Sequence, residues 1–159
     1  MKNITIQLDS IDKALLHLVQ QDASLGVAQM AERVGLTTTP CWRRIQRLQS
    51  AGVIRKSVTL LAPEKLNLQL TVFVHIKALR HDSEWLKQFA NHTSAFDEVV
   101  EFYRLSGEYD YLLKVLVADM AGFDHFYKRF IAGTQLQDVT SSFAMENIKN
   151  STELPLNHL

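Results

Sequence analysis

Residues 35–54, GLTTTPCWRRIQRLQSAGVI, constrain the fold more than any other stretch of the chain. They predict a helix with a defined start and a defined end. Thr37 or Thr38 can cap its first turn, and Pro40 falls inside that turn, where a missing backbone N–H costs nothing. Gly52 is the kind of residue at which such a helix ends, because glycine readily adopts positive φ.

The two sides of this predicted helix differ in chemistry. At 100° per residue, Cys41, Ile45 and Leu48 form an apolar stripe that is expected to be buried. The side turned away from the stripe is basic and holds Arg43, Arg44 and Arg47. An exposed basic helix face is often only a solvated surface, so this helix alone leaves nucleic-acid binding and simple solvation open.

Cys41 and Trp42 raise the alternatives of a metal, redox or stacking role. Cys41 is the only cysteine, which excludes an intrachain disulfide and a zinc site built from cysteines. Its place in the apolar stripe predicts a small buried hydrophobe rather than a reactive thiol. The six histidines are scattered and form no HExxH pair, so no metal site is predicted. Trp42 lies at the edge of the stripe and is expected to pack on its flank rather than stack on a base.

Two more helices are predicted before this one. LDSIDKALLHLVQQDA begins at an N-cap, Asp9, with Asp12 in the first turn, where negative charge is favoured. Its apolar side consists of Ile11, Ala14, Leu15, Leu18 and Val19. GVAQMAERVGL is shorter, and Gly35 ends it. Its apolar side consists of Val27, Met30, Ala31 and Val34. Two short helices joined by a tight turn, the second with a basic face, predict a helix-turn-helix.

In a helix-turn-helix the later helix enters the major groove of DNA, and its N-terminal residues contact base edges. Threonine hydroxyls at that end suit phosphate oxygens, and arginines suit guanine edges or phosphates. The predicted DNA-binding residues are Thr37, Thr38, Thr39, Arg43, Arg44 and Arg47. The net charge is +4 over residues 1–56 and −4 over residues 57–159, a pattern typical of a basic nucleic-acid module joined to a second functional domain.

The residues after the third helix connect two predicted domains. Residues 53–61 alternate enough to form a strand, which would make the helix-turn-helix winged, or an extended linker. Arg55 and Lys56 are then placed to touch a nucleic-acid backbone. The predicted division is a DNA-binding domain over 1–60, a hinge over 61–70, and a ligand-sensing and oligomerisation domain over 71–159.

The C-terminal part predicts a sheet covered by helices. Its predicted order is a strand at 71–79, a helix at 82–92, two strands within 98–119, a helix at 120–133 and a strand at 138–149. The order βαββαβ is that of a ferredoxin-like fold with an antiparallel sheet and both helices on one face, so the whole chain is predicted to be α+β. The other face is expected to be covered by a second copy of the chain.

Two stretches of this domain, LSGEYDY and VTSSFAM, are the most similar to a ligand site. Gly107 lets a backbone approach closely, and Asp110 can hold a ligand ammonium. Thr140, Ser141 and Ser142 offer hydroxyls and strand backbone groups. The alternative is structural: a glycine turn, an aspartate that caps it, and a polar strand face.

Taken together, the motifs resemble the Lrp/AsnC family of bacterial and archaeal transcription regulators. The pattern L-[ST]-x-[ST]-P-C-x-x-R-[IV]-x-R-L-x-x-x-G and the SGEYDY element carry the resemblance, which runs from about Leu8 to Leu156. It implies an N-terminal helix-turn-helix and a C-terminal RAM or ACT-like domain. It also implies dimers built through the sheets, commonly assembled into octamers or other multimers.

The resemblance further implies a small amino-acid effector bound between dimers. The site residues that it implies here are Ser106, Gly107, Tyr109, Asp110, Thr140, Ser141 and Ser142. Leucine, methionine and cysteine are the candidate effectors, and the subgroup that the sequence resembles is linked to sulfur amino acids. No other cofactor and no metal is expected.

Three other expectations concern function class and location. No nucleophile–base pair or metal cluster is visible, so an enzyme is not expected. An RNA-binding or purely ligand-binding module remains the alternative, with Phe73, Phe102 and Tyr103 as candidate stacking residues, although dimerisation explains them more simply. No apolar run is long enough to span a bilayer and the start lacks a secretory signal, so a cytoplasmic protein without a membrane partner is expected.

Overall fold

The computed structural model describes residues 6–158, whose contacts divide the chain into two compact units. The first unit comprises the chain up to Leu60 together with the tail from Lys149, and the second runs from Leu61 to Ile148. The tail joins the first unit through Gln20, whose side-chain amide hydrogen-bonds the backbone N–H and C=O of Leu154 at 2.6 and 3.4 Å. The sequence prediction placed this tail with the C-terminal domain, since local patterns carry no signal for a contact between such distant residues.

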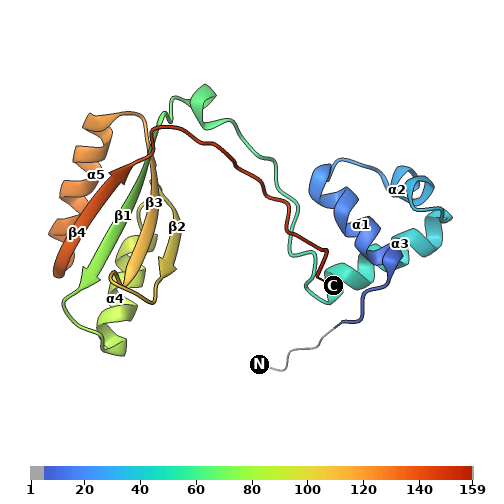
Figure 1. Cartoon of the computed structure of the whole chain (residues 1–159), viewed down its shortest axis with the longest axis horizontal. Helices are drawn as coiled ribbons and strands as arrows, with labels where there is room; N and C mark the ends of the chain where they lie inside the picture. The colour runs from blue at the N-terminus through green and yellow to red at the C-terminus, as the bar shows by residue number, and fades with distance from the viewer. Residues whose placement is uncertain (1–5, 159) are drawn as a thin grey trace. The chain divides into compact units, whose positions relative to one another are not determined.

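The first unit is a bundle of three helices, α1 (Ser10–Gln21), α2 (Val27–Arg33) and α3 (Thr38–Ser50) (Figure 1). Asp9 caps α1 as predicted, and Asp12 completes a capping box by accepting from the Asp9 backbone N–H. Gly35 and Gly52 end α2 and α3 with φ of 68° and 74°, a conformation that favours glycine.

The bundle buries the apolar stripe predicted for α3. Cys41 and Leu48 have no exposed surface and Ile45 is 7% exposed. The buried cluster consists of Leu15, Met30, Ala31, Cys41 and Ile45. Ala14 was expected in this core but is exposed, whereas Leu16 is buried. The buried side of α1 therefore lies slightly around the helix from the predicted one.

Residues 53–62 run as extended chain and pair with no described strand, so the linker is the alternative observed and no wing strand forms there. A short 3₁₀-helix, Pro63–Leu66, follows and ends at Asn67 in the left-handed conformation.

The second unit has the predicted βαββαβ order. Its elements are β1 (Leu70–Ala78), α4 (Ser83–Ser94), β2 (Val99–Arg104), β3 (Tyr111–Val117), α5 (Met120–Ala132) and β4 (Leu136–Phe143). The sheet order is β2-β3-β1-β4, and every pairing is antiparallel. This is the ferredoxin-like arrangement, and Figure 1 shows α4 and α5 packed against the sheet.

One face of the sheet and the two helices share an aromatic-rich core. Val72, Val74 and Ile76 of β1 are fully buried, while Phe73, His75 and Lys77 alternate onto the opposite face. Across the core lie Phe89 of α4 and Phe123, Phe126 and Phe130 of α5. Ile131, next to Phe130 on α5, is 40% exposed. No helix in the described chain is long and apolar enough to cross a membrane.

Candidate functional site

The N-terminal end of α3 presents three exposed threonines. Thr37 is the N-cap residue, and its hydroxyl makes no capping hydrogen bond. Thr38 and Thr39 occupy the first two helical positions and are exposed as well. All three hydroxyls therefore lie beside the unsatisfied N–H groups of the first turn, a combination suited to phosphate oxygens.

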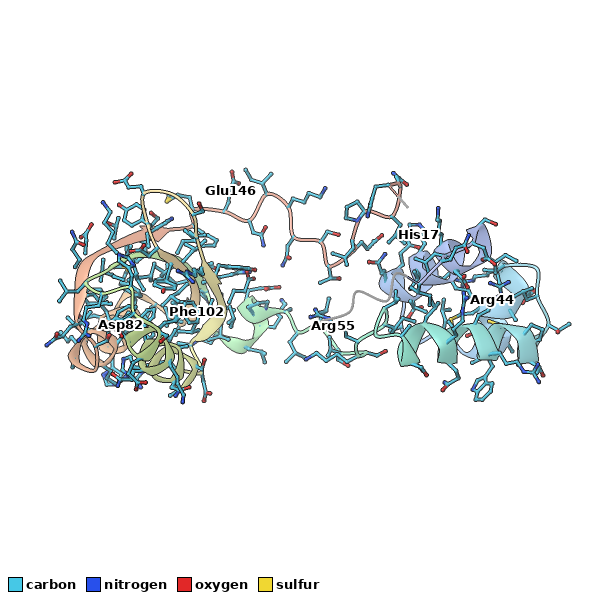
Figure 2. All side chains as sticks on the ribbon, turned by 90° about the horizontal axis from the view of Figure 1, so that it is seen from below. His17, Arg44, Arg55, Asp82, Phe102 and Glu146 are labelled. Atoms are coloured by element: carbon cyan, nitrogen blue, oxygen red, sulfur yellow. The ribbon has the colours of Figure 1, made fainter. Side chains whose placement is uncertain are left out.

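Arg44 does not lie on the outward face of α3 as predicted. Its Nη1 donates to Asp9 at 2.7 Å and to Asp12 at 2.9 Å, and its side chain is only 28% exposed. Figure 2 shows Arg44 between α3 and α1. The helical projection placed Arg44 outward because it contains no neighbouring helix, whereas the start of α1 lies along this flank of α3.

Arg47 shares the same carboxylate. Its Nη2 donates to Asp12 Oδ2, while Arg44 occupies Oδ1. Asp12 has no exposed surface, and a buried charge is tolerated only when it is paired and hydrogen-bonded. The side chain of Arg47 is still 47% exposed, so it pairs with Asp12 and also reaches solvent.

The second carboxylate at this site is held in its charged form. The backbone N–H of Asp12 and, after it, the Arg44 guanidinium lower the pKa of the Asp9 carboxyl. Hydrogen bonds to the Asp9 carboxylate and, after it, to the Asp12 carboxylate raise the pKa of Arg44. The arginine–aspartate cluster therefore joins α3 to the start of α1 at neutral pH.

The outward face of α3 carries different side chains from the predicted arginine row. We call Thr39, Trp42, Arg43 and Gln46 the reading face, because all four are exposed and lie away from the buried stripe. Arg43 forms no ion pair with any residue that the structure describes. Trp42 is 51% exposed and lies outside the buried cluster, so about half of its surface is open to solvent.

In the second unit, Asp110 has a structural partner. Its Oδ2 accepts the backbone N–H of Ala78 at 2.8 Å, and its Oδ1 lies 3.8 Å from Nδ1 of His81. The Asp110 backbone also bonds to Ile76 and Leu105. This aspartate fixes the end of β1 to the β2–β3 loop, and its second carboxylate oxygen faces His81.

Tyr109 lies on the open face of the sheet, the face opposite α4 and α5. Its ring centroid is 5.2 Å from that of His75 and 5.0 Å from the Lys77 ammonium, and its hydroxyl is 3.4 Å from Oγ1 of Thr140. Glu108 pairs with Lys77 at 3.2 Å and raises the pKa of that lysine. The loop thus brings aromatic, basic and hydroxyl groups together over β1 and β4.

The remaining predicted effector residues divide between two faces. Thr140 and Ser142 are paired with His75 and Phe73 of β1 and share the open face with them. Ser141 pairs with the buried Val74, so it points toward the helices and away from its two neighbours. Ser106 and Gly107 lie exposed in the loop, Gly107 with a φ of 157°.

Two alternative sites find little support in the described chain. No group of three or more histidine, cysteine or carboxylate side chains is arranged there to hold a metal ion. Phe102 was a candidate stacking residue, but its ring packs among Phe89 and Tyr111, with centroids 5.5 and 5.7 Å away, on the helix face. Phe73 and Tyr103 do lie on the open face.

Family models match both units. The AsnC-type helix-turn-helix domain matches residues 8–49, and the Lrp/AsnC ligand binding domain matches residues 71–154, more than half of the chain. This chain belongs to the Lrp/AsnC family. The family consists of transcription regulators, and the matched ranges cover α1, α2, nearly all of α3 and nearly all of the βαββαβ sheet domain.

Individual Lrp/AsnC proteins are similar over nearly the full length. The DNA-binding transcriptional activator DecR of Escherichia coli (strain K12) is 52% identical over 94% of this chain and 99% of its own. The crystal structure of an AsnC family regulator from Agrobacterium tumefaciens is 54% identical, with a TM-score of 0.93 over 96% of this chain and 99% of that one. A regulator from Neisseria meningitidis, solved as its L-Met complex, is 37% identical, with a TM-score of 0.91 over the same shares.

Sequence reasoning missed several residues at these two sites of the Lrp/AsnC chain. Asp12 was predicted only to place a favourable negative charge in the first turn of its helix. Its position among apolar residues on the buried side of α1 could have indicated that it is buried. No role was predicted for His75 and Lys77. Their proximity to Tyr109 depends on how the β2–β3 loop folds back, which no local pattern records.

Proposed function

We propose that this protein is a sequence-specific DNA-binding transcription regulator whose DNA binding or assembly responds to a small amino acid. One observation carries the proposal: α3 of the AsnC-type helix-turn-helix presents an unpaired arginine and polar side chains outward, beside a threonine-rich start. That combination matches a helix inserted into the major groove.

The predicted DNA-binding residues have different surroundings, and we propose different roles for them. Thr37, Thr38 and Thr39 contact phosphates at the helix start, and Arg43 contacts a base edge or phosphate from the reading face. Arg44 acts mainly by fixing α3 to α1, because both of its acceptors are on the chain itself. Arg47 has both roles: it holds α3 to α1 by pairing with Asp12, and its half-exposed side chain can also contact DNA.

The effector site that we propose is the open face around Tyr109 and Thr140, with the β2–β3 loop at its edge. The Lys77 ammonium suits a ligand carboxylate, and the Asp110 carboxylate oxygen beside His81 suits a ligand ammonium. Methionine is our first candidate effector because a relative 37% identical to this chain was solved with L-Met. Leucine and cysteine are the next candidates.

We further propose a homodimer in which a second copy covers the open sheet face around Phe73, Leu112 and Leu116, beside the effector site, and which assembles into an octamer or another multimer. Phe73, Leu112 and Leu116 on this face are only half buried in the single chain, and Tyr103 is exposed. A second copy would bury them and place two α3 helices at half-sites related by the dimer axis. The regulator acts on DNA in the cytoplasm and has no catalytic role.

Coupling between effector and DNA requires that the effector binds one assembly state better than another, since equal affinity would change nothing. The test is selection of duplex fragments from a random library with the purified protein, with and without methionine, leucine, cysteine and glutamate. We expect one enriched motif whose apparent affinity shifts with one of the amino acids. Enrichment of single-stranded RNA instead of duplex DNA, in a parallel selection, would contradict the proposal.

A further inference from the structure

Trp42 is the one large apolar side chain on the exposed surface of α3. Its side chain is 51% exposed, belongs to neither buried cluster and makes no ring contact with any described residue. About half of its surface is therefore open to solvent and available to a partner that approaches this surface.

The neighbours of Trp42 are those of the reading face. Thr38 and Thr39 precede it by one helical turn, and Gln46 follows it by one turn, so their side chains lie on the same flank of the helix. Arg43 is adjacent and forms no ion pair within residues 6–158. Trp42 therefore lies within the N-terminal half of α3, the part of such a helix that meets base edges.

The chemistry of the major groove limits what an indole can recognise there. Base edges present hydrogen-bond donors and acceptors to that groove, and the thymine C5-methyl is the apolar group among them. An indole offers a broad apolar surface and a single N–H donor, and it carries no charge to attract a phosphate. Contact with thymine methyls removes apolar surface from water on both partners.

We propose that Trp42 is a specificity-determining residue that selects thymine by packing against its C5-methyl group in the major groove. The inference rests on the proposed DNA-binding function and adds a base preference to it. Arg43 supplies charge and hydrogen bonds next to Trp42, whereas Trp42 supplies an apolar requirement. The preferred duplex consequently contains thymine at a fixed distance from the contacts of Arg43.

The test compares thymidine with deoxyuridine, which lacks only the C5-methyl group of the base. The full-length protein first selects its duplex from a random library. Each thymine of that duplex is then replaced singly by deoxyuridine, and affinities are measured by fluorescence anisotropy at one salt concentration. The proteins compared are the wild type, Trp42→Ala, Trp42→Phe and Arg43→Ala.

At one or two thymines we expect the wild type to lose about fourfold in affinity on removal of the methyl, the value of one buried methylene-sized group. Trp42→Ala should bind the parent duplex about tenfold more weakly and be indifferent to the same replacements, a non-additivity that marks a direct contact. Trp42→Phe should keep most of the sensitivity. Arg43→Ala should keep the full sensitivity to deoxyuridine. Its plot of log affinity against log salt concentration should have a slope shallower by about one.

Two results would overturn the inference about Trp42 and leave the proposed DNA-binding function intact. In the first, the wild type is insensitive to every deoxyuridine replacement; in the second, Trp42→Ala is as sensitive as the wild type. The second result would place the indole against sugar or phosphate instead of a methyl. If the wild type enriches no duplex, the proposed DNA-binding function fails and the inference fails with it. Circular dichroism and thermal unfolding of Trp42→Ala should match the wild type, since the side chain lies outside the core.

Discussion

Arg44 on α3 and Asp12 on α1 are joined by a 2.9 Å hydrogen bond between a guanidinium and a carboxylate without exposed surface. Arg47 donates to the other carboxylate oxygen, so Asp12 has two cationic partners from the same helix. A buried carboxylate that loses a partner keeps its desolvation penalty and loses part of its compensation. The pair therefore fixes the position of α3 against α1, and it affects DNA binding only through that position.

Alanine substitution of Arg43 and of Arg44 should affect different properties. Arg44→Ala should lower the free energy of unfolding by about 1–3 kcal/mol, because a charged hydrogen bond to a buried group is lost. Arg43→Ala should change stability by less than about 0.5 kcal/mol and weaken duplex binding by about 1–3 kcal/mol. Urea unfolding and anisotropy titrations measure the two quantities. Equal stability of the two variants would contradict the assignment of Arg44 to the α1–α3 contact.

Acid should weaken the first unit through Asp9. Its folded-state pKa is lowered below the ordinary value of 3.8, chiefly by the Asp12 backbone N–H and then by Arg44. The stabilisation is therefore fully present above that ordinary value and is lost as the pH falls through the folded-state pKa. Urea midpoints measured from pH 6 down to pH 3 should fall more steeply for the wild type than for Asp9→Asn. Parallel curves would show that this carboxylate contributes nothing to the pH dependence.

The distinction between Arg43 and Arg44 shows where sequence reasoning stops. Helical periodicity was sufficient to bury Cys41, Ile45 and Leu48. These are properties of one element and its own core. Periodicity assigns the remaining positions to solvent by default.

Residues whose surroundings come from distant segments were assigned incorrectly or left without a role. Trp42 was expected to pack because its position borders the apolar stripe, but about half of its surface is exposed. Ser141 was grouped with Thr140 and Ser142, although strand alternation alone separates it from them. Tyr109 was placed in the loop, yet its contacts with His75 and Lys77 depend on the path of that loop over the sheet.

The Cys41 thiol should be unreactive in the folded protein. It is fully buried, and burial raises the pKa of its thiol, which lowers the thiolate fraction at neutral pH. Ellman's reagent should therefore react with this cysteine only as fast as the first unit opens, and at once in urea. Rapid stoichiometric labelling of the native protein would revive the redox alternative for this residue.

Gly133, after the end of α5, should not tolerate a side chain. A Cβ at this position would lie 2.2 Å from Cε1 of His92, whose ring packs between Phe96 and Phe130 and whose Nε2 is 2.9 Å from the Phe130 carbonyl oxygen. Gly133→Ala should lower the free energy of unfolding by about 1–3 kcal/mol through overpacking. The matched control is Gly122→Ala in α5, where the new Cβ has only ordinary contacts.

That control should be neutral or stabilise the protein by about 0.5–1 kcal/mol, because alanine favours the helix. Both variants can be compared by thermal and urea unfolding of the same preparation. If Gly133→Ala is as stable as Gly122→Ala, His92 moves aside without cost and its packing is looser than the structure indicates.

Asp110 offers a test that separates a structural from a ligand-binding role. Asp110→Ala removes the acceptor of the Ala78 N–H and should destabilise the second unit by about 1–3 kcal/mol. Loss of effector binding in that variant would thus be ambiguous. Asp110→Asn retains an oxygen acceptor at the same place and should keep most of the stability, but it removes the negative charge.

The charge-specific comparison is therefore calorimetric titration of methionine, leucine and cysteine into wild type and Asp110→Asn. If the carboxylate holds the ligand ammonium, Asp110→Asn should bind the effector at least tenfold more weakly, because a charge-assisted hydrogen bond is reduced to a neutral one. Thr140→Val, which removes a hydroxyl on the open face and leaves Asp110 intact, should weaken binding to a smaller degree. Equal affinity in wild type and Asp110→Asn would restrict Asp110 to its contact with Ala78 and shift the ammonium site to Glu108, the other carboxylate of the loop.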